Sequence, residues 1–247
     1  MAEGIRRRRT QSPPLPDVQM EEATVCVHAG VTNLQAVFDG PRWTLPIKYT
    51  ILTPTYNHRG VHMSRLVAAA QKHSSAGYLE DSLRRICQEV DRTQPGSRVS
   101  AQLEYPYKDQ FVHIKIETAQ NSLLHYSFER IGITACPCSR KIIGIGHMQR
   151  ASLKLQVTSP AILDFEEVAL KMGECFSTVP EELLKRPDEA RKITDAQLNP
   201  KFAEDLVREC LRRFPNASRI EARCFESIHV HDAIAIWSRT EDFAMPA

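Results

Sequence analysis

The chain has 247 residues, of which 42% are apolar and 25% charged, a composition typical of a folded globular protein. Its net charge is only +2 although Arg6 to Arg9 lie in one basic run, so the remainder lacks the positive charge of a nucleic-acid binder. No apolar run reaches the length of a membrane span or follows the basic N-terminus as in a secretory signal. The seven cysteines are odd in number and irregularly spaced, which favours a reducing compartment over a disulfide framework. We therefore expect a cytoplasmic protein without membrane or nucleic-acid partners.

Residues 1–20 are rich in arginine and then in proline, which predicts a disordered, mobile arm. The first half of the remaining chain predicts a strand, two helices and then further strands. Its expected elements are a strand over 44–53, a helix beginning near Ser64, a helix over 79–92, and strands over 98–105, 110–118 and 122–134.

The second half repeats this order of elements. We expect a strand over 151–158, helices over 163–172 and 200–214, and strands over 219–225 and 233–238. Asn199 and Pro200 have the pattern of a helix start, with a capping residue followed by proline. The repeated order predicts an α+β fold with helices on one face of antiparallel sheets, in two modules of about 21–120 and 121–247.

Two pairs of potential metal ligands share one spacing. Cys136 and Cys138 are one residue apart, and His229 and His231 repeat that spacing, while His147 follows eleven positions after the first cysteine. Alternate side chains of a strand point to one face, so each pair is expected to converge if its segment is extended. A cysteine and histidine set that leaves one position for water is typical of a catalytic zinc-type site. The pattern therefore indicates an enzyme.

The alternative interpretation is that the cysteines are small buried hydrophobic residues, which is common for free cysteine. The spacing of Cys136 and Cys138 also differs from the Cys-x-x-Cys of zinc fingers and ribbons, so a structural zinc site has little support.

Several segments together resemble the GTP cyclohydrolase IB family, the prokaryotic enzyme type that opens the guanine ring of GTP for pterin synthesis. The segments occur in the family's order and cover nearly the whole chain after the arm: LPDVQ (15–19), AGVTNL (29–34), RGVHMSR (59–65), ACPCS (135–139), GHMQR (146–150), LKRPDE (184–189), NPKFAED (199–205) and ESIHVHDA (226–233). The chain departs from the family pattern at two points: the loop over 140–146 is one residue shorter, and Met148 stands where asparagine is usual.

The resemblance implies a fold of tandem tunnelling-fold modules, two ββααββ units per chain, that assemble into a barrel-type homotetramer with active sites between subunits. It also implies a divalent metal, which is zinc, iron or manganese. The ligands implied for this metal are Cys136, His147, Glu189 and His229.

Further roles follow from the same resemblance. His231 and Cys138 would handle protons beside the metal, and Glu204 would anchor guanine through two charge-assisted hydrogen bonds. The helical pattern puts Glu204 at the margin of an apolar face, where a side chain can be partly buried; the alternative is a solvated glutamate on the flank of the helix. His62 and Arg65 match substrate-binding positions. The basic residues available for the triphosphate are Arg59, Arg65, Arg140, Lys141, Arg150 and Arg186.

The reaction implied is attack of water on C8 of GTP, loss of that carbon as formate, and formation of 7,8-dihydroneopterin triphosphate. Three alternatives remain open: an archaeal-type cyclohydrolase that gives a dihydroneopterin cyclic phosphate, a nitrile reductase of the same fold that uses a nucleophilic cysteine and NADPH, and a non-catalytic metal- or RNA-binding protein that uses the arginine-rich arm.

Overall fold

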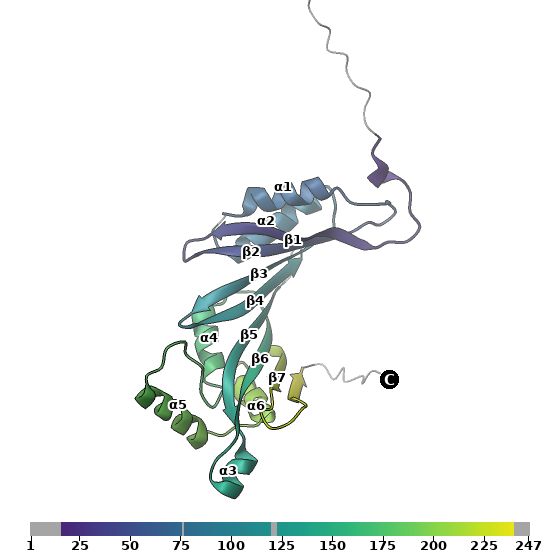
Figure 1. Cartoon of the computed structure of the whole chain (residues 1–247). Coiled ribbons are helices and arrows are strands. Elements are labelled where there is room, and N and C mark those ends of the chain that lie inside the picture. The colour runs from purple at the N-terminus through teal and green to yellow at the C-terminus, as the bar shows by residue number, and fades with distance from the viewer. Residues whose placement is uncertain (1–15, 76, 120–122, 240–247) are drawn as a thin grey trace, which may run out of the picture.

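The computed structural model describes residues 16–75, 77–119 and 123–239, so most of the predicted N-terminal arm lies outside the described residues. The described chain forms one eight-stranded antiparallel sheet in which each strand pairs with its neighbours in sequence, from β1 to β8 (Figure 1). The strands are β1 (His28–Asp39), β2 (Thr44–Pro54), β3 (Arg98–Tyr107), β4 (Gln110–Ala119), β5 (Leu124–Ala135), β6 (Met148–Ser159), β7 (Ala217–Cys224) and β8 (Ala233–Ser238). The helices are α1 (Met63–His73), α2 (Leu79–Asp91), α3 (Pro137–Ile143), α4 (Phe165–Gly173), α5 (Arg186–Leu198) and α6 (Ala203–Arg213).

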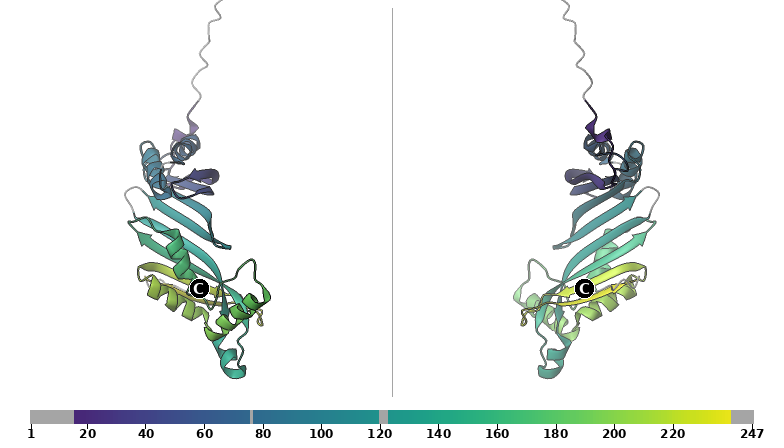
Figure 2. Two further views of the ribbon diagram at one scale, coloured as in Figure 1. Left: turned by 90° about the vertical axis from the view of Figure 1, so that its left-hand side faces the viewer. Right: turned by 90° about the vertical axis from the view of Figure 1, so that its right-hand side faces the viewer.

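Helices cover one face of this sheet, and the core lies beneath them. In β2, Ile47, Tyr49 and Ile51 are buried while Lys48 between them is exposed, as the two-residue period of a strand requires. The helices α1 and α2 pack on the first four strands, whereas α4 and α6 pack mainly on the later ones (Figure 2). Each fully buried aliphatic side chain contributes about 2 kcal/mol to folding. The expected α+β fold with an antiparallel sheet is therefore confirmed.

The opposite face of the sheet is polar. A groove of about 800 Å³ lies over β1 to β5 and includes Lys48, Glu104 and His113 in its lining. His113 Nδ1 lies 3.4 Å from a carboxylate oxygen of Glu104 on the neighbouring strand. Among the helices of the described residues, none has both the length and the apolar character needed to cross a bilayer.

The element order expected twice is present, as β1-β2-α1-α2-β3-β4 and then β5-β6-α4-α6-β7-β8, but β1, α3 and α5 were not predicted. Strand β1 was not predicted because its sequence lacks a regular two-residue period. Its pairing register shifts between Val31 and Leu34, where Asn33 has a φ of 54°. Helix α3 has no buried residue and α5 has one, so neither helix has the apolar stripe from which a helix is predicted.

One local prediction was wrong. Asn199 ends α5 and does not begin the next helix, because α6 starts at Ala203 and the side chain of Asp205 accepts a hydrogen bond from the Phe202 amide at 3.0 Å. At the end of the segment predicted to be a mobile arm, Val18–Met20 forms a 3-10 turn. The amide of Gly60 donates to the carbonyl of Gln19 at 3.1 Å, which fastens this turn to the rest of the chain.

Candidate functional site

The β5–β6 hairpin brings Cys136 next to His147. Ala135 and Met148 form the last paired positions of the two strands, and the amide of Cys136 donates to the carbonyl of His147 at 2.9 Å. A Cβ atom on Gly146 would lie 2.6 Å from the carbonyl oxygen of Cys136, so only glycine permits this approach. The pairing of the strands thus places two potential metal ligands side by side although α3 separates them in sequence.

The two cysteines do not lie on a strand, which corrects the expectation from their spacing. Cys136 is the N-cap of α3 and Pro137 is the first helical residue, a position that proline favours. Residues two apart on a helix differ by about 200° in direction, so the two thiols do not share a face. Cys136 is half-buried and Cys138 is exposed.

A hydrogen-bonded network fixes the His147 ring. Its Nδ1 lies 2.9 Å from Oε1 of Gln149 and 3.6 Å from a carboxylate oxygen of Glu226. Nε2 of Gln149 in turn donates to Glu226 at 3.3 Å. Because an amide oxygen only accepts, Nδ1 carries the ring proton and Nε2 keeps the lone pair that a metal requires. Gln149 and Glu226 were not predicted as site residues, although each lies in a segment that carried the resemblance.

His229 and His231 lie in the loop between β7 and β8, not on a strand as expected. Their rings are nevertheless stacked with centroids 5.0 Å apart, and the His229 ring lies 6.2 Å from that of His147. Both side chains are exposed. The base of the loop is held by the Phe225 amide, which donates to the carbonyl of Arg150 at 2.9 Å. The loop therefore presents two stacked imidazoles next to the ring of His147.

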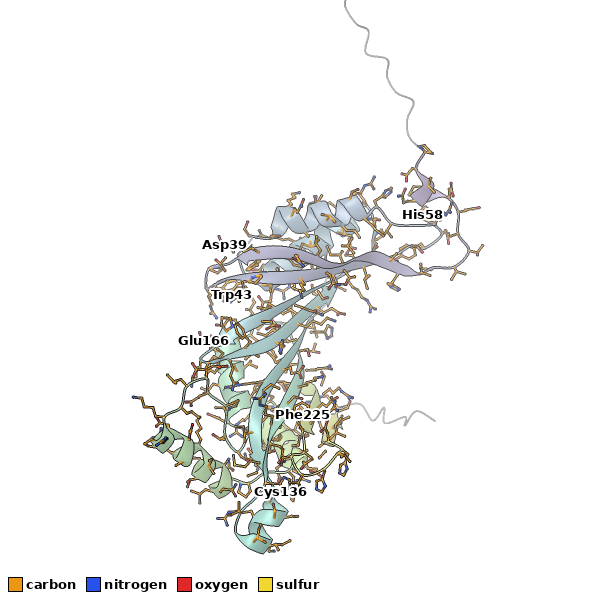
Figure 3. All side chains as sticks on the ribbon, in the orientation of Figure 1. Asp39, Trp43, His58, Cys136, Glu166 and Phe225 are labelled. Carbon is orange, nitrogen blue, oxygen red and sulfur yellow. The ribbon has the colours of Figure 1, made fainter. Side chains whose placement is uncertain are left out.

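A hollow of about 580 Å³ adjoins this loop, within the size range of ligand pockets. Its lining consists of Ile131, Gln149, Arg150, Phe225 and Ser227. Figure 3 shows Phe225 and Cys136 in the same half of the molecule.

Glu204 lies in the first turn of α6 and is exposed. Its carboxylate lies near Cys224 at the end of β7: burial, opposed by a hydrogen bond from Thr134 and assisted by the charges of Glu226, Glu204 and Asp232, raises the pKa of the Cys224 thiol to about 11. These three acids therefore surround the end of β7 from which the histidine loop begins, and Glu204 lies on the side of the molecule that carries His147.

Glu189 does not join the other predicted ligands within one chain. The last turn of α5 is hydrogen-bonded to the α3–β6 loop. The side-chain amide of Gln197 accepts a hydrogen bond from the N–H of Gly146 at 2.7 Å and donates one to its carbonyl at 2.9 Å. Glu189 lies about two turns earlier, roughly 12 Å along the helix axis, and is exposed. No cluster of three or more His, Cys, Asp or Glu side chains close enough to hold a metal occurs within the described residues. The four-ligand set stays a prediction.

The substrate-binding candidates His62 and Arg65 lie at the other end of the molecule. His62 caps α1, and its Nε2 is 3.7 Å from a carboxylate oxygen of Asp17, while Arg65 is exposed. Figure 3 shows His58, in the loop that leads to α1, at the opposite end from Cys136. Within one chain, the predicted site residues therefore form two groups at opposite ends of the molecule.

Comparison with known proteins gives one consistent result. A family profile described as "Type I GTP cyclohydrolase folE2" matches residues 15–235. GTP cyclohydrolase FolE2 of Geobacter sp. (strain M21) is 30% identical over 210 residues, which cover 76% of this chain and 77% of the relative. "GTP cyclohydrolase FolE2 2" of Cupriavidus metallidurans is 32% identical, with 73% and 75% covered. GTP cyclohydrolase FolE2 of Dictyoglomus turgidum is 33% identical, with 72% and 76% covered.

Proposed function

The chain belongs to the FolE2 family of type I GTP cyclohydrolases, and we propose on that premise that it converts GTP and water into 7,8-dihydroneopterin triphosphate and formate at the entry to folate synthesis. GTP cyclohydrolase activity itself follows from the family, whose name replaces the broader designation type IB. The observation that carries the site assignment is the close approach of Cys136 and His147, beside His229 and with Glu204 on the same side.

The donors around this hairpin fit a divalent metal. A thiolate and imidazoles suit zinc and iron, and a carboxylate also admits manganese. Cys136, His147 and His229 would hold the metal, with Glu189 as the fourth ligand. When bound, the metal supplies a nucleophilic water at neutral pH and stabilises charge that develops on the purine. The network of Gln149 and Glu226 supports this assignment. It holds Nδ1 of His147 as a hydrogen-bond donor, so the unprotonated Nε2 on the other side of the ring is free to bind a metal.

The remaining residues bind substrate and move protons. The exposed carboxylate of Glu204 accepts two parallel hydrogen bonds from the ring N–H and the exocyclic amino group of guanine. His231 and Cys138 are exposed beside the hairpin, where they exchange protons with the substrate, and imidazole suits this task because it titrates near neutral pH.

A homotetramer of tunnelling-fold chains would complete the site. His62, Arg65 and Glu189 lie apart from Cys136 within one chain, so a second copy would supply them. The strands β1 and β8 each pair on one side only among the described residues, which leaves edges that another chain can cover. Large apolar side chains are also exposed around the hairpin and the histidine loop: Ile142, Ile143, Ile145, Ile228 and Val230. This is the composition of a surface that a partner subunit buries.

The test is product analysis with matched cysteine variants. Wild-type protein supplied with metal should release formate from GTP and give a pterin that keeps three phosphates and fluoresces after oxidation. Cys136→Ala should lose both metal and turnover, whereas Cys26→Ser, at an exposed cysteine before β1, should keep both. Normal turnover by Cys136→Ala would overturn the site assignment. A cyclic phosphate product would overturn the proposed product and leave the assignment intact.

A further inference from the structure

A second hollow lies between the two halves of the chain, away from the hairpin that carries Cys136. Its volume is about 340 Å³, within the size range of sites that hold a small ring compound. We call this hollow, which is bordered by residues 38, 40–43, 78–80, 105 and 162–166, the junction pocket. Its walls come from the β1–β2 turn, the start of α2, the end of β3 and the start of α4. Figure 3 shows Trp43 and Glu166, which both line it, on one edge of the molecule.

Aromatic rings make up much of the wall. The ring centroid of Trp43 lies 5.3 Å from that of Phe38 and 6.1 Å from that of Phe165. The ring of Tyr105 lies edge-on to both Trp43 and Phe165, at 6.3 and 5.5 Å. Phe38, Tyr105 and Phe165 are buried, whereas Trp43 is only half-buried. Three buried rings therefore hold the Trp43 ring in place, and part of its surface stays open to the pocket.

Carboxylates outnumber cations in the lining. Glu80, Asp164 and Glu166 line the pocket, and Arg42 is its one basic residue among those that the structure describes. Arg42 pairs with Asp164 at 3.3 Å, and its guanidinium lies 5.7 Å from the centre of the Tyr78 ring. This pairing leaves Glu80 and Glu166 without a basic side chain in ion-pair contact, as far as the described residues extend. The pocket therefore combines an aromatic wall with an excess of negative charge.

Glu80 is the most informative of these acids because its side chain is 2% exposed. Tyr126 donates a hydrogen bond to its Oε1 at 3.0 Å, and burial raises the pKa of the carboxyl. A buried carboxylate without a cation is unfavourable, and a positive charge placed in the pocket would relieve that cost. Glu166 likewise accepts a hydrogen bond from the Tyr105 hydroxyl, at 3.2 Å. Two carboxylates with tyrosine partners thus border a space in which a further cation would be stabilised.

We propose that the junction pocket is a binding site for a planar aromatic cation that carries N–H donors, of which an aromatic amidine is the simplest form. The ring of this ligand would lie against Trp43, and its N–H groups would donate to the carboxylates of Glu80 and Glu166. Positive charge is also favoured over an aromatic face, as the guanidinium of Arg42 beside the Tyr78 ring shows at the same pocket. The ligand would contact the β1–β2 turn and the start of α4, so it would join the two halves of the chain.

The probe is benzamidine, and the reporter is the fluorescence of Trp43. The chain has two tryptophans, so Trp237→Phe leaves Trp43 as the single reporter. Conversely, Trp43→Phe leaves Trp237, which lies on β8 and does not line the pocket. Benzamide has the same ring and nearly the same shape but no charge, and it serves as the matched neutral compound. Each full-length variant is titrated with each compound at neutral pH.

We expect benzamidine to change the fluorescence of Trp43 saturably, with a Kd on the order of 1 mM or below. Benzamide should bind at least roughly 10-fold more weakly, because it lacks the charge that the carboxylates recognise. The fluorescence of Trp237 in Trp43→Phe should not respond. At about ten times the Kd, benzamidine should raise the melting temperature of the wild type by on the order of 3 °C, since it binds only the folded state.

Glutamine variants in the Trp237→Phe background test the acids. Glu80→Gln and Glu166→Gln should each weaken benzamidine binding roughly 10-fold, because a neutral amide replaces a charged acceptor. Glu167→Gln is the matched control: its acid is next in sequence but pairs with Lys171 outside the pocket, and it should keep wild-type affinity. Glu166 is exposed, so its variant tests the proposal even if the buried Glu80→Gln does not fold.

Three results would overturn the proposal. The first is the absence of both a saturable fluorescence change and a rise in melting temperature with benzamidine. The second is equal affinity for benzamide and benzamidine, and the third is unchanged affinity in Glu166→Gln. None of these measurements depends on GTP turnover or on a bound metal, so failure here is distinguishable from failure of the proposed function.

Discussion

The amide of Cys136 donates a hydrogen bond of 2.9 Å to the carbonyl of His147, one step beyond the last paired positions of β5 and β6. This bond continues the hairpin past its regular strands and closes the α3 loop at its base. The two residues on either side of this loop are in contact through their backbones although α3 lies between them. The relative position of the Cys136 and His147 backbones is therefore a property of sheet pairing.

Gly146 permits this contact, and its replacement should break it. In Gly146→Ala the added Cβ meets backbone atoms of Cys136, so we expect a loss of about 1–3 kcal/mol in unfolding free energy and at least a roughly 10-fold loss of GTP turnover. The matched control is Gly144→Ala, where φ is +82° but no atom lies within 4 Å of the new Cβ. That variant should lose about 1 kcal/mol and retain activity. Denaturant unfolding and formate release check both, and equal activity in the two variants would contradict the role of the contact.

Glu226 and Gln149 should act on metal binding through His147. Glu226→Ala removes the acceptor that holds Gln149, so metal affinity and kcat/KM should each fall about 10–100-fold. Glu226→Gln keeps an acceptor oxygen and should recover part of this loss. Glu221→Ala, at an acid that pairs with Arg219 on β7, is the control and should retain wild-type affinity. Metal titration of stripped protein checks the series. Unchanged affinity in Glu226→Ala would show that the network does not position the imidazole.

Mixed oligomers should reveal whether two copies share one site. His62→Ala and Cys136→Ala chains should each be inactive alone, because each removes one of the two groups that lie at opposite ends of the chain. In an oligomer co-assembled from equal amounts, roughly a quarter of the interfacial sites should receive both intact groups and regain turnover. The control is a mixture of the separately assembled variants, in which activity should stay absent. Absence of activity after co-assembly would contradict an interfacial site.

Glu80 should make stability depend on pH. Its side chain is buried, its carboxylate accepts a hydrogen bond from Tyr126 at 3.0 Å, and burial raises its pKa. A raised pKa in the folded state contributes stability that is present below the unfolded pKa and is lost as pH rises through the folded value. Glu80→Gln keeps the acceptor without titrating, so its stability relative to wild type should increase from pH 4 to pH 8. Denaturant unfolding across this range checks the trend. Glu167→Gln, at an exposed acid, should track the wild type, and a parallel curve for Glu80→Gln would contradict the interpretation.

The sequence predicts those parts of the fold in which periodicity is regular. Strand β8 matches its expected bounds, and α2 matches within a residue, because their apolar patterns are uninterrupted. Strand β1 contains a bulge at Asn33, and α5 buries only Ala196, so neither pattern shows the usual period. These failures have local physical causes.

The site was predictable only in part for a different reason. Residue types and spacing identified Cys136 and His147 as potential ligands, but their contact arises from strand pairing, which spacing does not encode. Gln149 and Glu226 carry no signal of their own, since they act by holding another side chain. The distance between His62 and Cys136 is a property of the tertiary structure, and residues that a second chain would contribute cannot be located from periodicity along one chain.

The most direct test of the central claim is an anaerobic assay of chelator-stripped protein with GTP, to which manganese, iron or zinc is added back. Formate release and the fluorescence of the oxidised pterin are followed together. We predict that both signals are absent from stripped protein, return with at least one of these metals, and stay absent in Cys136→Ala. Metal binding without formate from GTP, or formate release that persists without metal, would contradict a metal-dependent GTP cyclohydrolase built on Cys136 and His147.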